Sequence, residues 1–234
     1  AISTGDYNTI IGASTGSSLT TGGRNVAIGY SALYNEDTTG RVVAIGYQAL
    51  ENQNAAGNTY NVAIGYRTGR DIIGGTYNIL MGNDSGGSLT SGSQNVAIGT
   101  NALSTEDTRG YNVAVGNYAL QDLNSATDAY NVAVGYEAGK EITAGTYNTI
   151  LGAQAMSVGV TTGDYNVAIG NLAGDALTSG ERNILIGSSA GDALTTGDYN
   201  TAVGHGSLSA EDEHGGNVAV GYKTLNAQNA GANA

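Results

Sequence analysis

A five-residue motif, made of asparagine, three mostly apolar residues and glycine, recurs along the whole chain. The leading asparagine is present in twelve of the thirteen copies and is replaced once, by Val42. Consecutive motif glycines are 17, 18 or 19 residues apart; they are Gly12, Gly29, Gly46, Gly65, Gly82, Gly99, Gly116, Gly135, Gly152, Gly170, Gly187, Gly204 and Gly221. This regularity indicates a repeat architecture in which every repeat adds the same short element.

A 17-residue repeat with one apolar triplet is too short for the common helical repeats and suits one coil of a β-solenoid. Val and Ile favour strands, whereas Asn and Gly tolerate positive φ at corners. The sequence therefore predicts an all-β protein, a parallel β-solenoid (β-roll) of about thirteen coils of 17–19 residues, forming a single repeat domain over residues 1–234. A longer period of 70 residues groups the coils into superblocks, roughly 7–76, 77–146 and 147–234.

The motif asparagines are expected to stack at one corner of the coil, where amide side chains can hydrogen-bond along the axis. This role is structural and requires no ligand. The predicted coil-corner ladder consists of Asn8, Asn25, Asn61, Asn78, Asn95, Asn112, Asn131, Asn148, Asn166, Asn183, Asn200 and Asn217.

A large apolar residue follows the glycine in nearly every coil. It is the fourth residue in some coils, such as Leu33 and Leu103, and the seventh in others, such as Leu19 and Leu89. We interpret the two forms as mutually exclusive, because a close-packed interior with room for one large side chain would penalise both a void and an overfilled coil.

The strand pattern also predicts self-association. With alternating faces, we expect the first and third apolar residues of the motif to point inward and the middle residue to point outward. The middle position is never polar, and a strand that is apolar on both faces is normally buried on both. The predicted self-assembly face comprises Ile10, Leu80, Ile150 and Leu185. Its expected partner is the chain itself, as a homotrimer or an end-to-end polymer; a monomeric solenoid is the alternative.

The two ends of the sequence both lie within a coil. We expect either a segment of a longer fibre or a subunit that polymerises end to end, since open strand edges favour stacking.

The composition disfavours several other functions. Twenty acidic residues against eight basic ones give a net charge of −12, which disfavours nucleic acid and anionic lipid as partners. There is no cysteine, and no apolar run near 18 residues predicts membrane insertion. The two histidines, His205 and His214, occupy turn-like stretches, and we expect no catalytic residue, no metal and no cofactor.

Acidic pairs recur at matched coil positions, at Glu36-Asp37, Glu106-Asp107 and Glu211-Asp212. They could bind Ca²⁺, but the copies lie too many coils apart to share an ion. A solubilising edge is the preferred interpretation.

Two stretches show a family resemblance. The segments Tyr60-Asn-Val-Ala-Ile-Gly-Tyr66 and Thr196-Gly-Asp-Tyr-Asn-Thr-Ala-Val-Gly204 resemble the repeats of bacteriophage tail-fibre proteins. The Asn-Val-Ala-Ile-Gly core is similar to the β-roll heads of trimeric autotransporter adhesins. The resemblance implies a parallel β-roll, trimerisation and attachment to a host or surface.

These observations together predict a non-enzymatic structural element of a self-assembling extracellular fibre. One alternative is an adhesin head that recognises cell-surface glycans, either through the 19-residue coils containing 52–60 and 123–130 or through exposed aromatic rings. The predicted surface-contact residues are Tyr30, Tyr47, Tyr66, Tyr136 and Tyr222. Ice binding is the least favoured alternative, because the threonine pairs are adjacent rather than alternating.

Overall fold

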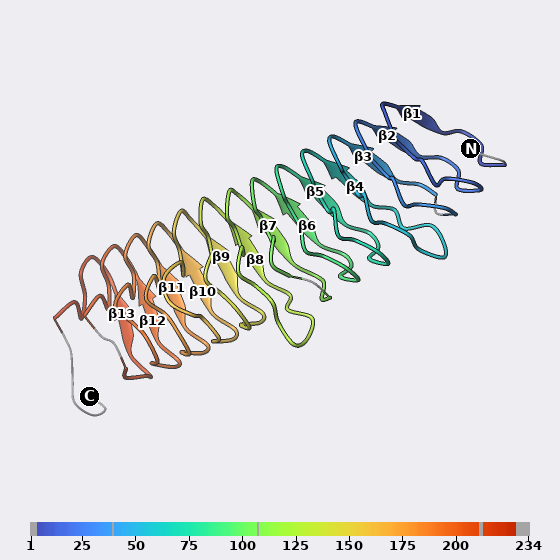
Figure 1. Ribbon diagram of the computed structural model, residues 1–234. Helices are drawn as coiled ribbons and strands as arrows, with labels where there is room; N and C mark the ends of the chain where they lie inside the picture. Colours follow the sequence, from blue (N-terminus) through green and yellow to red (C-terminus); the bar gives the residue numbers. More distant parts are fainter. Residues whose placement is uncertain (1–3, 39, 107, 211–212, 228–234) are drawn as a thin grey trace. The chain divides into compact units, whose positions relative to one another are not determined.

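The computed structural model describes residues 4–38, 40–106, 108–210 and 213–227. Within this part the chain is all-β, a β-solenoid of thirteen parallel three-residue strands and about twelve turns, without helices (Figure 1). The predicted fold class is therefore confirmed. The strands are β1 (Thr9–Ile11), β2 (Val26–Ile28), β3 (Val43–Ile45), β4 (Val62–Ile64), β5 (Ile79–Met81), β6 (Val96–Ile98), β7 (Val113–Val115), β8 (Val132–Val134), β9 (Thr149–Leu151), β10 (Val167–Ile169), β11 (Ile184–Ile186), β12 (Thr201–Val203) and β13 (Val218–Val220).

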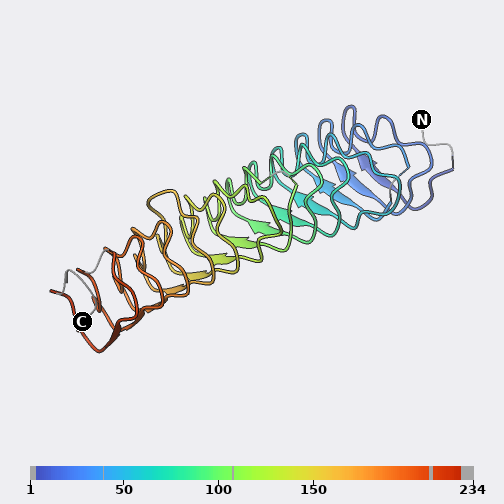
Figure 2. The same cartoon turned by 90° about the horizontal axis from the view of Figure 1, so that it is seen from below.

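The chain forms two compact units, residues 1–115 and 116–234. The first contains β1–β7 and the second β8–β13, and in each the strands follow chain order (Figure 2). The pairing is in register: Val26 lies beside Val43 in the first unit, and Val167 beside Ile184 in the second. Identical motif positions therefore form continuous rows along each unit. The boundary between the units does not coincide with a superblock boundary, and the single repeat domain stays a prediction.

The motif glycine ends each strand because no larger residue fits there. Gly46 has φ of 134°, and a Cβ atom added to it would lie 2.1 Å from the carbonyl oxygen of Gly65 in the next coil. Both the backbone conformation and the close approach of successive coils therefore require glycine.

The two faces of the strands are the reverse of the sequence prediction. The middle residue of the triplet is completely buried in most coils, as with Ala63 and Leu80, whereas its two neighbours are half-buried or exposed. The expectation that Val and Ile point inward is wrong. The predicted self-assembly face is also wrong: Leu80, Ile150 and Leu185 lie in the core, and Ile10 occupies the same inward position, partly exposed, in β1.

The physical reason for this reversal is that residues outside the strand fill the interior. Most coils contribute buried side chains at the third position after the glycine and at the fourth or seventh position or both, such as Ala49, Leu50 and Ile72. This leaves space for only a small residue in the middle of most strands, which explains why alanine predominates there.

Larger middle residues occur where a neighbouring coil carries glycine at its fourth position. A Cβ atom added to Gly69 would lie 2.8 Å from Cδ1 of Leu80, and one added to Gly86 would lie 2.9 Å from its Cδ2. In the second unit, Gly174 and Gly191 leave the same kind of space for Leu185. A larger side chain in the middle of a strand is thus accompanied by glycine in a loop of the same or an adjacent coil, so that the core stays close-packed without overfilling.

The predicted exclusion between the fourth and seventh positions fails in one coil. Leu120 and Leu123 are both completely buried in the same 19-residue coil. The other 19-residue coil also buries both positions, as Leu50 and Gln53. The interior therefore accepts side chains at both positions, and it does so in 17-residue coils as well, which bury Leu33 with Glu36 and Leu103 with Glu106.

Candidate self-association face and surface rows

The outward residues of the strands form two aliphatic rows on each unit. The rows flank the buried middle residue and consist of Val, Ile, Leu and Met, apart from Thr9, Thr149 and Thr201. Several members are exposed, including Ile79 at 43%, Ile184 at 41% and Val134 at 39% of the residue's possible surface. We call these two rows the outer sheet face.

The outer sheet face carries no charged residue. It is bordered along the chain by two further exposed rows, at the residue before the motif asparagine and at the residue after the motif glycine. Tyrosines dominate the first of these rows and recur in the second, at residues such as Tyr60 and Tyr66. The result is an uncharged, regularly spaced strip in a protein whose net charge is −12, with amphipathic edges in which Arg24, Arg41 and Arg182 take the place of a tyrosine in the first border row.

The predicted asparagine ladder is present and almost completely buried. In the first unit, the backbone N–H of Asn95 donates to Oδ1 of Asn78 at 3.0 Å, and Nδ2 of Asn78 donates to the carbonyl of Gly92 at 2.9 Å. In the second unit, Asn183 bonds in the same way to Asn200 and Gly197. Most bonds in the ladder therefore join amide side chains to backbone groups of the following coil, rather than amide to amide.

The tyrosines after the motif glycine stack where successive coils both carry one. The ring centroids of Tyr30 and Tyr47 lie 5.3 Å apart, and those of Tyr47 and Tyr66 lie 5.2 Å apart, with interplanar angles of 15° and 9°. In the second unit, the ring of Tyr136 meets Tyr118 edge to face, and that of Tyr222 meets His205 in the same way. All five predicted contact tyrosines are exposed, and a surface contact through them stays a prediction.

The tyrosines before the motif asparagine form a second set of stacks. Tyr130, Tyr147 and Tyr165 stack at 5.1 and 4.9 Å, and the guanidinium of Arg182 continues the column between Tyr165 and Tyr199. All of these corner residues have positive φ, between 53° and 59°. Stacking offsets part of the conformational cost of this backbone region, roughly 1–2 kcal/mol per residue.

Stacking has a consequence for ligand binding. Within each column, a ring face that contacts a neighbouring ring is not available to stack on a sugar. The columns present mainly ring edges and hydroxyl groups to solvent, which does not favour glycan recognition by ring stacking.

The structure corrects the interpretation of the acidic pairs. Glu36 and Glu106 are completely buried, at the coil position that elsewhere holds a core Leu or Ile. Glu36 accepts hydrogen bonds from the backbone N–H of Thr38 at 3.1 Å and from Nε2 of Gln53 at 3.3 Å. These glutamates therefore organise a turn from within the coil and are not part of a solubilising edge. Asp107, Glu211 and Asp212 lie outside the described residues.

The histidines contribute to no cluster of chemical groups. His205 packs against the ring of Tyr222, and the carbonyl of His214 accepts a hydrogen bond from Asn200. Across residues 4–38, 40–106, 108–210 and 213–227, no group of three potential metal-ligating side chains occurs.

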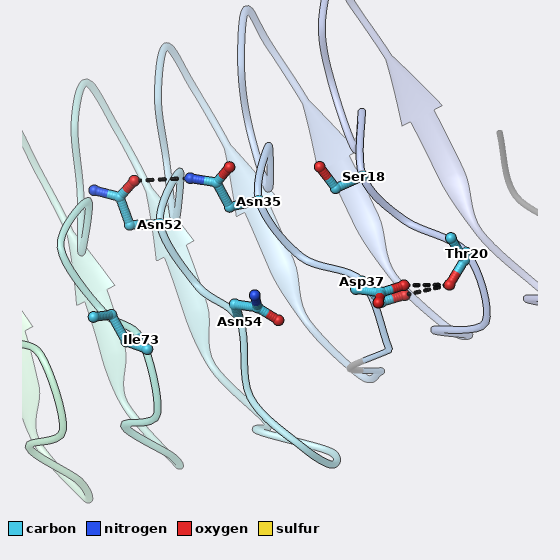
Figure 3. A pocket seen from close by; sticks show the side chains of 7 residues that line it. All are labelled: Ser18, Thr20, Asn35, Asp37, Asn52, Asn54 and Ile73. Atoms are coloured by element: carbon cyan, nitrogen blue, oxygen red, sulfur yellow. Dashed lines mark hydrogen bonds between the residues drawn. The ribbon is translucent and has the colours of Figure 1, made fainter.

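A polar groove lies beside the first 19-residue coil, close to the stretch 52–60 that the sequence analysis singled out. Its volume is about 620 Å³, and two outward rows line it (Figure 3). One row is the sixth residue after the motif glycine, Ser18, Asn35 and Asn52. The other is the eighth residue after it, Thr20, Asp37, Asn54 and Ile73. The buried seventh residue separates the two rows.

The row of sixth residues changes its chemistry along the chain. Nδ2 of Asn52 donates to Oδ1 of Asp71 at 3.2 Å, and the Arg70 guanidinium beside Asp71 lowers the pKa of that carboxyl. Seventy residues later, the corresponding residues are two acids, Asp122 and Glu141. Burial, with a smaller contribution from the charge of Glu141, raises the pKa of Asp122.

Comparisons with protein-family models, with curated proteins and with solved structures find no match. The part of the chain that the structure describes also has no helix of the length and apolarity needed to cross a membrane. Fold and surface chemistry are therefore the basis for a functional assignment.

Proposed function

We propose that this chain is a non-enzymatic structural element of an extracellular fibre, which assembles through its outer sheet face with further copies of itself. The observation that carries the proposal is the pair of exposed aliphatic rows, which are free of charged residues. Soluble monomers seldom expose contiguous apolar patches of this kind, and larger patches usually mark interaction sites.

A second copy of the chain is the partner that fits this surface best. The rows repeat at the strand spacing of about 4.8 Å. Another copy presents the same spacing, so that side chains of facing rows can interdigitate along the length of the contact. A globular partner would match the periodic pattern over a few strands only.

The size of the surface is also consistent with a stable interface. In the first unit, seven strands cover about 30 Å along the axis, and the outer sheet face with its tyrosine borders is about 20 Å wide. The resulting area of roughly 600 Å² approaches the approximately 800 Å² per partner of standard protein interfaces. Two neighbours around a three-fold axis could share such a face, as in a homotrimer.

Charge substitutions in the second unit test the proposal. Replacing Val134 and Ile184 with Glu places two carboxylates in the outer sheet face, and we expect this double variant to sediment as a monomer. Val160 is 64% exposed but lies outside the strands, so the matched Val160→Glu variant should keep the oligomeric state of the unchanged chain. Identical masses for all three proteins would contradict assembly through this face.

A further inference from the structure

The direction of the amide groups beside the groove is fixed by Asp71. Ionised carboxylates only accept hydrogen bonds, so Asn52 must turn its Nδ2 toward Asp71. Its Oδ1 then faces the preceding coil, where it accepts a hydrogen bond from Nδ2 of Asn35 at 3.0 Å. Consequently Oδ1 of Asn35 points away from Asn52, on the side of Ser18 (Figure 3).

The groove therefore presents two groups that only accept hydrogen bonds, Oδ1 of Asn35 on one side and the carboxylate of Asp37 on the other. The hydroxyl of Ser18 and the amide of Asn54 lie beside them and can accept as well as donate. Thr20 donates its hydroxyl to Asp37, which orients the carboxylate (Figure 3). Of the described residues that line the groove, Asp37 alone is charged. Arg70, next to Asp71 in sequence, is neutralised by two hydrogen bonds to Asp71, at 2.9 and 2.7 Å.

An apolar side chain completes the lining. Ile73 continues the row of Thr20, Asp37 and Asn54, and 53% of the residue's possible surface is exposed. It offers an aliphatic contact beside the acceptors, an arrangement that suits a cationic head on a methylene chain.

We infer that this groove binds a protonated alkylammonium group, in which the ammonium donates to Asp37 and the amide oxygens while the methylene chain lies on Ile73. An ammonium has three donors and no acceptor, which matches an acceptor-rich lining with one negative charge. Two sources share this chemistry, a free polyamine and the side chain of a lysine on another protein. The inference does not depend on the proposed fibre assembly.

Isothermal titration calorimetry on the full chain tests the inference with three probes. We expect cadaverine to bind, and 1,5-pentanediol, which has the same carbon chain but no charge, not to bind. Nα-acetyl-lysine methylamide represents the lysine source, and its affinity relative to cadaverine shows which source the groove prefers. Equal binding of the diol and the diamine would overturn the inference, because the lining would then recognise hydroxyl groups without requiring a cation.

Two matched variants locate the site. Asp37→Asn should weaken cadaverine binding about tenfold or more, since it removes a charge-assisted hydrogen bond. Asp175 also accepts a hydrogen bond from a hydroxyl, that of Ser157 at 2.7 Å, but lies in the second unit, so Asp175→Asn should leave binding unchanged. If both variants weakened cadaverine binding equally, the diamine would be attracted diffusely to a chain of net charge −12, and the site would be overturned. Unfolding curves of each variant verify that the fold is intact.

Discussion

In most ladder asparagines, the amide side chain replaces backbone partners at a corner where regular strand pairing stops. Its oxygen accepts from the backbone of the next coil, and its nitrogen donates to a turn carbonyl in that coil. Because these groups are buried, removing the amide leaves its backbone partners without a hydrogen bond, and water cannot replace the lost partner. Asparagine is suited to this position because it is short, tolerates turns and offers one donor group beside one acceptor.

We predict that Asn78→Ala lowers the free energy of unfolding by about 2–5 kcal/mol, since two buried hydrogen bonds are lost. Asn83 lies in the same coil but is exposed, where its amide bonds only to Asp84, so Asn83→Ala should change stability by less than about 0.5 kcal/mol. Urea unfolding monitored by circular dichroism measures both values. Similar effects of the two substitutions would contradict a structural role for the ladder.

At the scale of one coil, packing couples residues that are distant in sequence. Leu80 in β5 fills the space above Gly69 and Gly86, so that the identity of a strand residue depends on loops in two coils. A position in this core is therefore defined by the volume that its neighbours leave, and substitutions at such positions should not be additive.

A double-mutant cycle tests this coupling. Gly86→Ala should destabilise the unchanged chain by about 2 kcal/mol or more, through positive φ and contact with Leu80. In the Leu80→Ala background the contact with Leu80 disappears while that with Cδ1 of Leu89, at 2.9 Å, remains, and the same substitution should cost at least about 1 kcal/mol less. Gly206 has a similar φ of 60° and would meet only Cγ of Lys223, so Gly206→Ala reports the backbone cost alone. If the effects of Gly86→Ala and Leu80→Ala on the free energy of unfolding were additive, the coupling between the strand residue and the loop glycine would be contradicted.

The strands also show which features the sequence could predict. The repeat length, the parallel stacking and the asparagine ladder follow from the regular spacing of Asn and Gly. The expectation that the motif asparagine takes positive φ is wrong, because the preceding residue, such as Tyr60 or Arg41, takes it instead. The inward direction of Ala63 or Leu80 does not follow, because a period of two tells which residues share a face but not which face is inside. The buried Glu36 was missed for the same reason: its inward position depends on alignment with Leu19 and Ile72 across coils, and not on its own polarity.

For the whole molecule, the packing that fills the core of each unit also determines which residues lie on its surface. The loops fill the core, so the strands retain small residues inside and place Val and Ile outside. The candidate groove lies beside a 19-residue coil, to which its Asn52 and Asn54 belong. Its chemistry could not be predicted from the sequence, since the direction of the Asn35 amide depends on the distant Asp71.

The most direct test of assembly through the outer sheet face is the mass of the unchanged chain in solution. Sedimentation equilibrium over a hundredfold range of micromolar concentrations separates a stable assembly from a concentration-dependent one. We predict a mass that is a multiple of 23.4 kDa, with three copies expected for a trimeric shaft. A mass of 23.4 kDa at every concentration would contradict the account, because the aliphatic rows would then remain exposed to water.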